Sequence, residues 1–167
     1  MVIVSAARLP EDLGTVRALF DEYAEWIGVD LSFQDFARER AELPGGYVPP
    51  RGALLLARDG ERVLGLVAMR PLESGVCEMK RLFVRESARG LGAGRALISG
   101  VLAAARAAGY ARMRLDTLPM MGTAIALYRA TGFHEIAPYR VNPIPGALFL
   151  ELDLAGAPAP SASQEDR

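Results

Sequence analysis

The segment between residues 89 and 95 contains three glycines at alternate positions, Gly90, Gly92 and Gly94, flanked by Arg89 and Arg95. Glycine lets the backbone approach a ligand closely because it has no Cβ atom. The first N–H groups of a helix that starts here would be unpaired, and the helix dipole is positive at that end. The segment therefore predicts a backbone cradle for phosphate, to which the two guanidinium groups add positive charge.

Two familiar phosphate-binding motifs do not fit this spacing. A Walker loop requires Gly-Lys-Ser/Thr, and no lysine follows these glycines. The dinucleotide fingerprint requires glycines at its first, third and sixth positions, but the sixth position counted from Gly90 is Arg95. Taken by itself, the segment leaves an ordinary glycine-rich turn open as the alternative.

The segment Arg89–Gly94 resembles the Arg-x-x-Gly-x-Gly signature of the GNAT acetyltransferases. A strand-like stretch, Glu78–Val84, precedes it, and the block Ala124–Phe133 is similar to the family's Ala-x-x-Leu-Tyr-x-x-x-Gly-Phe motif. Both motifs stand in the family's order, and the resemblance covers roughly residues 53–154. It implies an α/β (α+β) fold of the GNAT type, with a mixed, mostly antiparallel sheet of about seven strands flanked by about four helices.

The resemblance also implies roles for individual residues. Leu82, Phe83 and Val84 would lie along the pantetheine of acetyl-CoA, and the Leu82 N–H would polarise the thioester carbonyl. Tyr128 would contact the cofactor and act as general acid beside the CoA sulfur. Met121 stands where the family commonly has an asparagine, so that contact is lost or supplied elsewhere, by Thr117 or Thr123. The pyrophosphate would be held by Arg89, Gly90, Leu91, Gly92, Ala93, Gly94 and Arg95.

The attacking amine needs a way to lose its proton. An amine with a pKa near 10.4 is neutral in only about one molecule in 2,500 at pH 7. Glu78 resembles the position used as general base in the histone-acetylating branch of the family, and Asp116 is a second candidate. Leu82 lies four residues beyond Glu78, about 13 Å at full extension, so a bulge or a bridging water is required.

Two hypotheses of different class follow. The first is an N-acetyltransferase that moves an acetyl group from acetyl-CoA to an unidentified primary amine by direct attack in a ternary complex. The second is a non-catalytic acyl-CoA-binding or sensing module. Retention of Tyr128 and Glu78 favours the enzyme. The acceptor is expected to be a small-molecule amine or a peptide amine, because this fold serves many acceptors. A homodimer is left open.

The amino-acid composition argues against several other classes of protein. Nineteen basic residues stand against 20 acidic ones, so we expect no nucleic-acid partner. The single cysteine excludes an internal disulfide, and with a single histidine it argues against a built-in metal site. The apolar stretches are far shorter than the roughly 18 residues of a membrane span, and the first residues do not resemble a signal peptide. We therefore expect a cytoplasmic protein with no membrane partner.

The elements that must position these residues follow from periodicity and turn signals. The pattern predicts strands at 2–7, 53–58, 63–70, 76–84, 112–117, 133–141 and 147–154. It predicts helices at 13–27, from Ser32 to about 43, from the glycine-rich segment to about 108, and at 123–131. We expect residues 1–154 to form one domain, and residues 155–167 to form a disordered tail rich in Ala, Pro and Ser. Four aromatic residues would line the acceptor pocket or belong to the core: Trp26, Phe33, Phe36 and Tyr47.

Overall fold

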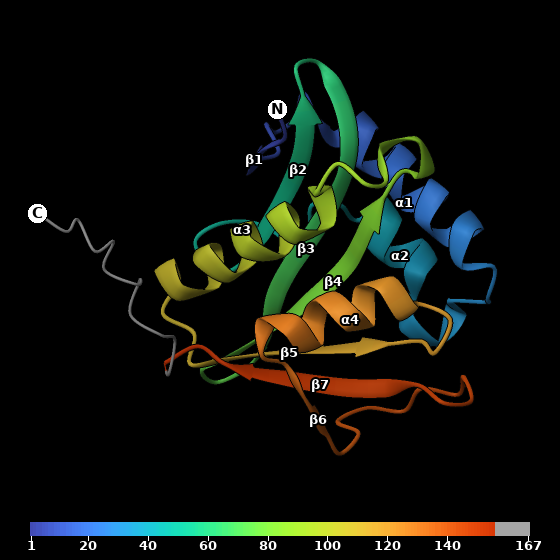
Figure 1. The fold of residues 1–167 in the computed structure, drawn as a ribbon, viewed down its shortest axis with the longest axis vertical. Coiled ribbons are helices and arrows are strands. Elements are labelled where there is room, and N and C mark those ends of the chain that lie inside the picture. The colour runs from blue at the N-terminus through green and yellow to red at the C-terminus, as the bar shows by residue number, and fades with distance from the viewer. Residues whose placement is uncertain (156–167) are drawn as a thin grey trace, which may run out of the picture.

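A computed structural model describes residues 1–155 as one seven-stranded sheet with helices on both faces (Figure 1). The strands lie in the order β1-β2-β3-β4-β5-β7-β6, and of the described pairs β4 and β5 run parallel while the others are antiparallel. The predicted fold class is confirmed. The strands are β1 (Ile3–Ala6), β2 (Ala53–Asp59), β3 (Arg62–Glu73), β4 (Val76–Val84), β5 (Arg112–Thr117), β6 (His134–Ile136) and β7 (Leu148–Asp153). The helices are α1 (Leu13–Ile27), α2 (Phe36–Ala41), α3 (Ala93–Ala107) and α4 (Gly122–Thr131). The predicted tail lies outside the described residues, except for Ala155.

Different helices cover the two faces of the sheet (Figure 1). Helix α3 presents Leu97, Val101 and Ala105, the predicted apolar face, to one core, where Tyr128 of α4 joins them. Helix α1 packs its apolar residues, such as Phe20, into the core on the other face. Successive residues of β4 divide between the two cores, as alternation along a strand requires.

Strands β4 and β5 separate along their length. They pair in parallel register only from Val76 to Glu78 on β4, opposite Arg112 to Arg114 on β5. Beyond that point β4 continues to Val84 and β5 continues to Thr117 with no further register pairs between them. The sheet is therefore split in its middle, and residues beside the split can be reached from both faces.

A bulge in β4 lies at the edge of this split. Ala68 of β3 pairs with Lys80 and Leu66 pairs with Phe83, so Arg81 and Leu82 together stand opposite a single residue of β3. Arg81 has φ 62°, the left-handed conformation that such an extra residue often adopts. A bulge was one of the two features expected between Glu78 and Leu82, the other being a bridging water, and the bulge is present. The Lys80 and Arg81 side chains extend from it toward the face of the sheet that α1 and α2 cover.

Two predicted elements were wrong in extent. The helix expected from Ser32 to about 43 is divided into a 3₁₀ turn (Ser32–Gln34) and α2, because Asp35 adopts φ 54° between them. Ser32 does not cap a helix; its own N–H donates to the Asp30 carboxylate. The strand expected over 133–141 ends at Ile136, since Pro138 has no N–H to donate to a ladder and the residues after it turn toward the split.

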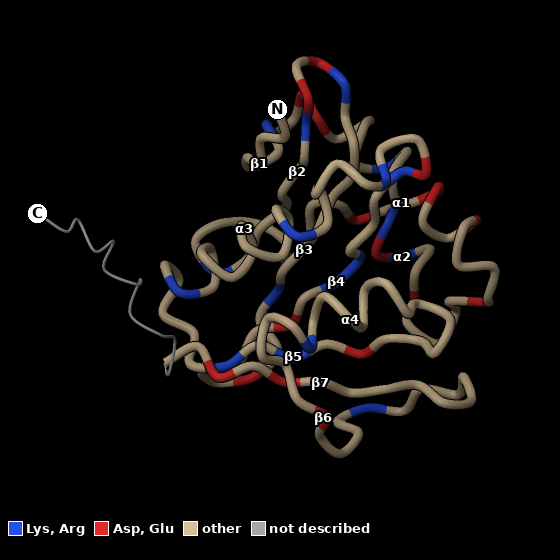
Figure 2. Tube along the Cα trace, in the orientation of Figure 1, with Lys and Arg blue, Asp and Glu red and all other residues tan. Residues whose placement is uncertain are grey.

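Charged residues of both signs are interspersed along the described trace (Figure 2). Around α2 and the middle of β4, acidic and basic positions lie side by side, and these residues form the network described below. None of the helices within residues 1–155 is long and apolar enough to cross a membrane.

Candidate active site

A groove of about 670 Å³ runs along the end of β4, between the N-terminus of α3 and α4. It is lined by Leu82, Phe83 and Val84 on β4, and by most of the glycine-rich segment. Of the residues predicted to bind the cofactor, only Leu91 and Tyr128 do not line it; Leu91 points outward and is 49% exposed. The remaining lining residues are Trp26, Ala88, Met120, Met121, Gly122, Thr123, Ala124 and Leu127.

The glycine-rich segment has the backbone geometry of an anion cradle. Gly90 and Gly92 have φ 82° and 81°, and Gly92 is the N-cap of α3. A Cβ atom built on either glycine would meet no atom within 4 Å, so it would project into open space. The unpaired N–H groups of the first turn of α3 lie at the same end of the groove, with Arg89 and Arg95 on its wall. This arrangement fits a pyrophosphate.

A second, much smaller cavity of about 30 Å³ lies in the split between β4 and β5. It shares Leu82 and Met121 with the groove, so the two spaces meet at the bulge. Its other walls are Tyr23, Gln34, Met79, Lys80, Arg81, Leu115, Asp116, Thr117 and Tyr128. A chain lying in the groove could therefore place one small group among these polar side chains.

Tyr128 and Asp116 both line this cavity. Tyr128 is buried, and the pKa of its phenol is raised by burial and by the negative charge of Asp116, so the hydroxyl keeps its proton. The Asp116 carboxylate accepts a hydrogen bond of 3.1 Å from the Asn142 side-chain amide. The cavity thus holds a buried phenol that keeps its proton and, at Asp116, a carboxylate.

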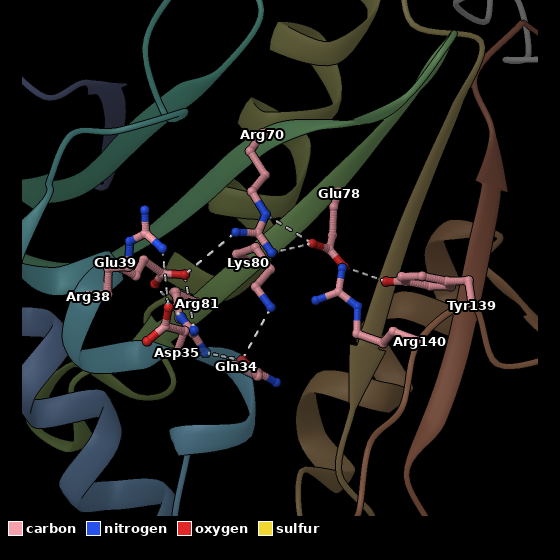
Figure 3. A network of polar contacts seen from close by, with 10 residues as sticks. All are labelled: Gln34, Asp35, Arg38, Glu39, Arg70, Glu78, Lys80, Arg81, Tyr139 and Arg140. Carbon is pink, nitrogen blue, oxygen red and sulfur yellow. Dashed lines mark hydrogen bonds and ion pairs between the residues drawn. The ribbon is translucent and has the colours of Figure 1, made fainter.

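Glu78 is not among the residues that line the cavity, and its carboxylate lies among Arg70, Tyr139 and Arg140 (Figure 3). Its side chain is fully buried, and it accepts hydrogen bonds from Arg70 at 3.1 Å and from the Tyr139 hydroxyl at 2.7 Å. Arg140 forms an ion pair with the same carboxylate. Burial alone would raise the pKa of Glu78, but Lys80, the Tyr139 hydrogen bond and the two arginines outweigh it and lower the pKa. Glu78 is a firmly held carboxylate, and its role as base stays a prediction.

Lys80 and Arg81 are site residues that the sequence analysis did not single out. Lys80 lines the cavity, is 4% exposed, and donates a hydrogen bond of 3.2 Å to the Gln34 side-chain oxygen. Arg81 donates to the same oxygen at 2.7 Å (Figure 3). The sequence did contain a signal that could have identified Lys80, because it is the only lysine in the chain.

The four aromatic residues that were expected either to line the acceptor pocket or to belong to the core lie in different places. Trp26 is 46% exposed and lines the groove, with the Arg89 guanidinium 5.6 Å from its ring centre. Phe33 and Phe36 pack against the core beneath α1. Tyr47 is buried in that core and also lines a third, polar pocket of about 210 Å³, which includes Gln34 and Arg70.

Met121 occupies the position where the family commonly has an asparagine. Met121 lines both the groove and the cavity, and its sulfur accepts a contact of 3.4 Å from the Thr117 hydroxyl. Thr123 lines the groove next to it. Of the two threonines named as replacements, Thr123 lines the groove and Thr117 lines the cavity. Within residues 1–155, no group of three or more His, Cys, Asp or Glu side chains could hold a metal ion.

Comparisons with known proteins agree with this geometry. Residues 15–133 match the family model described as the acetyltransferase (GNAT) family. An uncharacterized N-acetyltransferase of Schizosaccharomyces pombe is 40% identical over 156 residues, which cover 92% of this chain and 96% of the relative. A solved GNAT-family acetyltransferase of Staphylococcus aureus superposes with a TM-score of 0.76 at 17% identity, over 92% of this chain and 99% of that one. The PaiA N-acetyltransferase of Thermoplasma acidophilum, solved with coenzyme A, gives a TM-score of 0.71 at 14% identity, over 92% and 99%. The two structures are similar in fold.

Proposed function

Since this chain belongs to the GNAT acetyltransferase family and is an acyltransferase, we propose that it moves an acetyl group from acetyl-CoA to a primary amine by direct attack in a ternary complex. The acceptor is a small-molecule amine or a peptide amine. One observation carries the proposal: the groove with its anion cradle meets a polar cavity at Leu82, where a thioester carried along the groove would end.

The groove supports acetyl-CoA as the co-substrate. Its cradle fits the pyrophosphate, and Leu82, Phe83 and Val84 line the stretch that the pantetheine would follow. Arg81 and Leu82 have no register partners on β3 or β5, so the main chain there is available to pair with an amide-bearing chain. The Leu82 N–H would then donate to the thioester carbonyl and stabilise the oxyanion that forms on attack.

Tyr128 is proposed as the general acid. The departing sulfur becomes a thiolate, whose conjugate thiol has a pKa near 8.5. A phenol that keeps its proton, as burial makes Tyr128 do, can donate to that sulfur as the charge develops. The cavity is small and its phenol is buried, so little water competes for this proton transfer.

Asp116 is the base that the geometry favours over Glu78. Asp116 lines the cavity that the attacking amine must enter, and one of its oxygens binds Asn142. Glu78 reaches the cavity only through its neighbours, because its two oxygens are taken by Arg70, Tyr139 and Arg140. In this proposal, Asp116 accepts the proton and Glu78 holds the surrounding cations in place.

The test is CoA-thiol release from acetyl-CoA in the presence of a library of amines. We expect Tyr128→Phe to lower turnover by about 100-fold, with CoA affinity unchanged within about twofold. The matched control is Tyr110→Phe, which removes another buried hydroxyl, one that donates to the Arg51 carbonyl away from the cavity. If the protein binds CoA and no amine releases thiol, the non-catalytic sensing module replaces this proposal.

A pair of isosteric variants separates the two bases. Asp116→Asn should lower turnover by about 100-fold. Glu78→Gln should lower turnover much less, although it leaves Arg70 and Arg140 without their carboxylate and costs stability. The reverse pattern would assign the base role to Glu78.

A further inference from the structure

The chain uses arginine at 18 of its 19 basic positions and lysine once, at Lys80. That lysine is buried and lines the small cavity in the split of the sheet. Arginine stays protonated in proteins, whereas a lysine amine can lose its proton and become a nucleophile. The one position with a lysine is thus the one where a neutral amine would meet the thioester.

We propose that Lys80 is itself an acetyl acceptor, so that the enzyme modifies its own active site by moving an acetyl group from acetyl-CoA to the Lys80 Nζ atom. This inference rests on the proposed function, because the thioester must first reach the cavity at Leu82. It adds a site of covalent modification that requires no external amine.

The dimensions of the cavity bring the two reacting groups together. A volume of about 30 Å³ has room for only about two water molecules, so a group that enters it touches its walls. Lys80 and Leu82 are both in those walls, two residues apart on β4. The bulge at Arg81 lies between them, and both residues border the same space.

The surroundings of Lys80 make its amine unusually ready to react. Burial lowers its pKa to about 8, and the positive charges of Arg81 and Arg70 act in the same direction, while Glu78 and Asp116 oppose them. Gln34, from the turn before α2, contributes a neutral acceptor, and Tyr23 of α1 and Tyr128 of α4 contribute phenols. About a tenth of such amines are neutral at pH 7, against about one in 2,500 for an ordinary lysine.

The transfer balances without any further reagent. The Nζ lone pair attacks the acetyl carbonyl carbon, a C–N bond forms, and the thioester C–S bond breaks. The sulfur leaves as CoA thiol with the proton of Tyr128, which regains one from the solvent. The proton lost by Nζ passes to Asp116 or to water. The product is an uncharged acetyl-lysine that fills the cavity, so the modified enzyme should turn over external amines more slowly.

The experiment incubates the full-length protein with acetyl-CoA and no acceptor at pH 8, followed by intact mass and peptide mapping. We expect one acetyl group on Lys80, with an initial rate that rises between pH 7 and pH 9. Tyr128→Phe should slow its appearance by about 100-fold, because the machinery of transfer is shared. Two control variants remove the amine: Lys80→Arg keeps the positive charge, and Lys80→Met keeps a side chain of similar length without the charge. Neither variant should be acetylated at residue 80.

Each result decides the matter. Since the chain has one lysine, the N-terminal amine is the other primary amine, and acetylation confined to it would overturn the inference. Acetylation of Lys80 at equal rates in the wild type and in Tyr128→Phe would show simple chemical reaction and also overturn it. An unmodified Lys80 in a protein that acetylates external amines would overturn the inference alone. A protein that does not bind CoA would overturn the proposed function as well.

Discussion

The Arg81 guanidinium donates two hydrogen bonds to the Glu39 carboxylate, from Nε at 2.9 Å and from Nη2 at 3.2 Å. The two side chains are 1% and 10% exposed. Arg81 is the bulge residue of β4 and Glu39 lies in α2, so this pair fastens the helix to the edge of the split. The contact raises the pKa of Arg81 and lowers the pKa of Glu39, which keeps both groups charged despite their burial.

Removing one partner of this buried pair should be costly. Glu39→Gln leaves the Arg81 guanidinium without its counter-charge, and we expect the free energy of unfolding to fall by about 3 kcal/mol. Urea denaturation at pH 7 measures the change. The control is Glu42→Gln, just beyond α2, whose partner Arg38 is 70% exposed; it should cost no more than about 0.5 kcal/mol. Equal losses for the two variants would show that Arg81 and Glu39 form no special anchor.

The cradle predicts a difference between two glycines with similar backbones. Gly92 and Gly60 have φ 81° and 60°, and a Cβ atom on either would meet no atom within 4 Å. Gly92→Ala and Gly60→Ala should therefore each lose about 1 kcal/mol of stability through left-handed strain. Gly92 lines the groove and Gly60 does not, so only Gly92→Ala should weaken CoA binding, by about tenfold or more.

Calorimetric titration with CoA measures this second effect, and thermal melts measure the first. Gly60 lies in the turn between β2 and β3, far along the chain from the groove, which makes it a fair control for strain. If the two variants bind CoA equally well, the pyrophosphate does not lie on the backbone at Gly92.

Trp26 provides an optical signal for the groove. It is the only tryptophan in the chain, it lines the groove, and nearly half of its surface is exposed. A ligand in the groove should shield the indole from water, so its emission should move to shorter wavelength and saturate with CoA concentration. Gly92→Ala should require a correspondingly higher concentration for the same shift. Unchanged emission at CoA concentrations that calorimetry shows to be saturating would contradict this position for Trp26.

The sequence predicted the phosphate cradle because its signal is local. Glycine spacing and the start of a helix are both written in neighbouring residues, and the structure places Gly90 and Gly92 in left-handed backbone at the N-terminus of α3. The strands predicted at 53–58 and 63–70, on either side of Gly60, are present as the paired β2 and β3 for the same reason. The expectation of a bulge or a bridging water between Glu78 and Leu82 followed from the length of an extended strand.

The network around Glu78 could not be predicted in this way. Its partners Arg70, Tyr139 and Arg140 come from segments far apart in the sequence, and no spacing rule connects them. The strand expected over 133–141 placed Tyr139 and Arg140 in a ladder, whereas their side chains bind a carboxylate at the split. Tertiary contacts of this kind override local propensity, and they changed the role that Glu78 could be assigned.

Asp12 links acid stability to the start of α1. Its buried carboxylate accepts hydrogen bonds from the Arg8 main-chain N–H at 2.6 Å and from Arg58 at 2.9 Å. The Arg8 side-chain and main-chain hydrogen bonds, followed by Arg58, lower the pKa of Asp12 from 3.8 to about 2. A lowered pKa in the folded state means that the stabilisation is complete above about pH 4 and is lost as the pH falls toward 2.

We therefore expect Asp12→Asn to lower the free energy of unfolding at pH 7 by about 1–2 kcal/mol. This value is smaller than the full pKa shift would give, because the Arg8 side chain is 69% exposed and solvent screens its charge. The difference from the wild type should shrink as the pH falls from 4 and be small at pH 2, because about half of the wild-type carboxyls are protonated at a pH equal to their pKa. Urea denaturation at a series of pH values measures both. Asp35→Asn, at a residue whose side chain is 70% exposed, should change stability little at any pH. A deficit in Asp12→Asn that stayed constant down to pH 2 would mean that Asp12 acts by shape and not by charge.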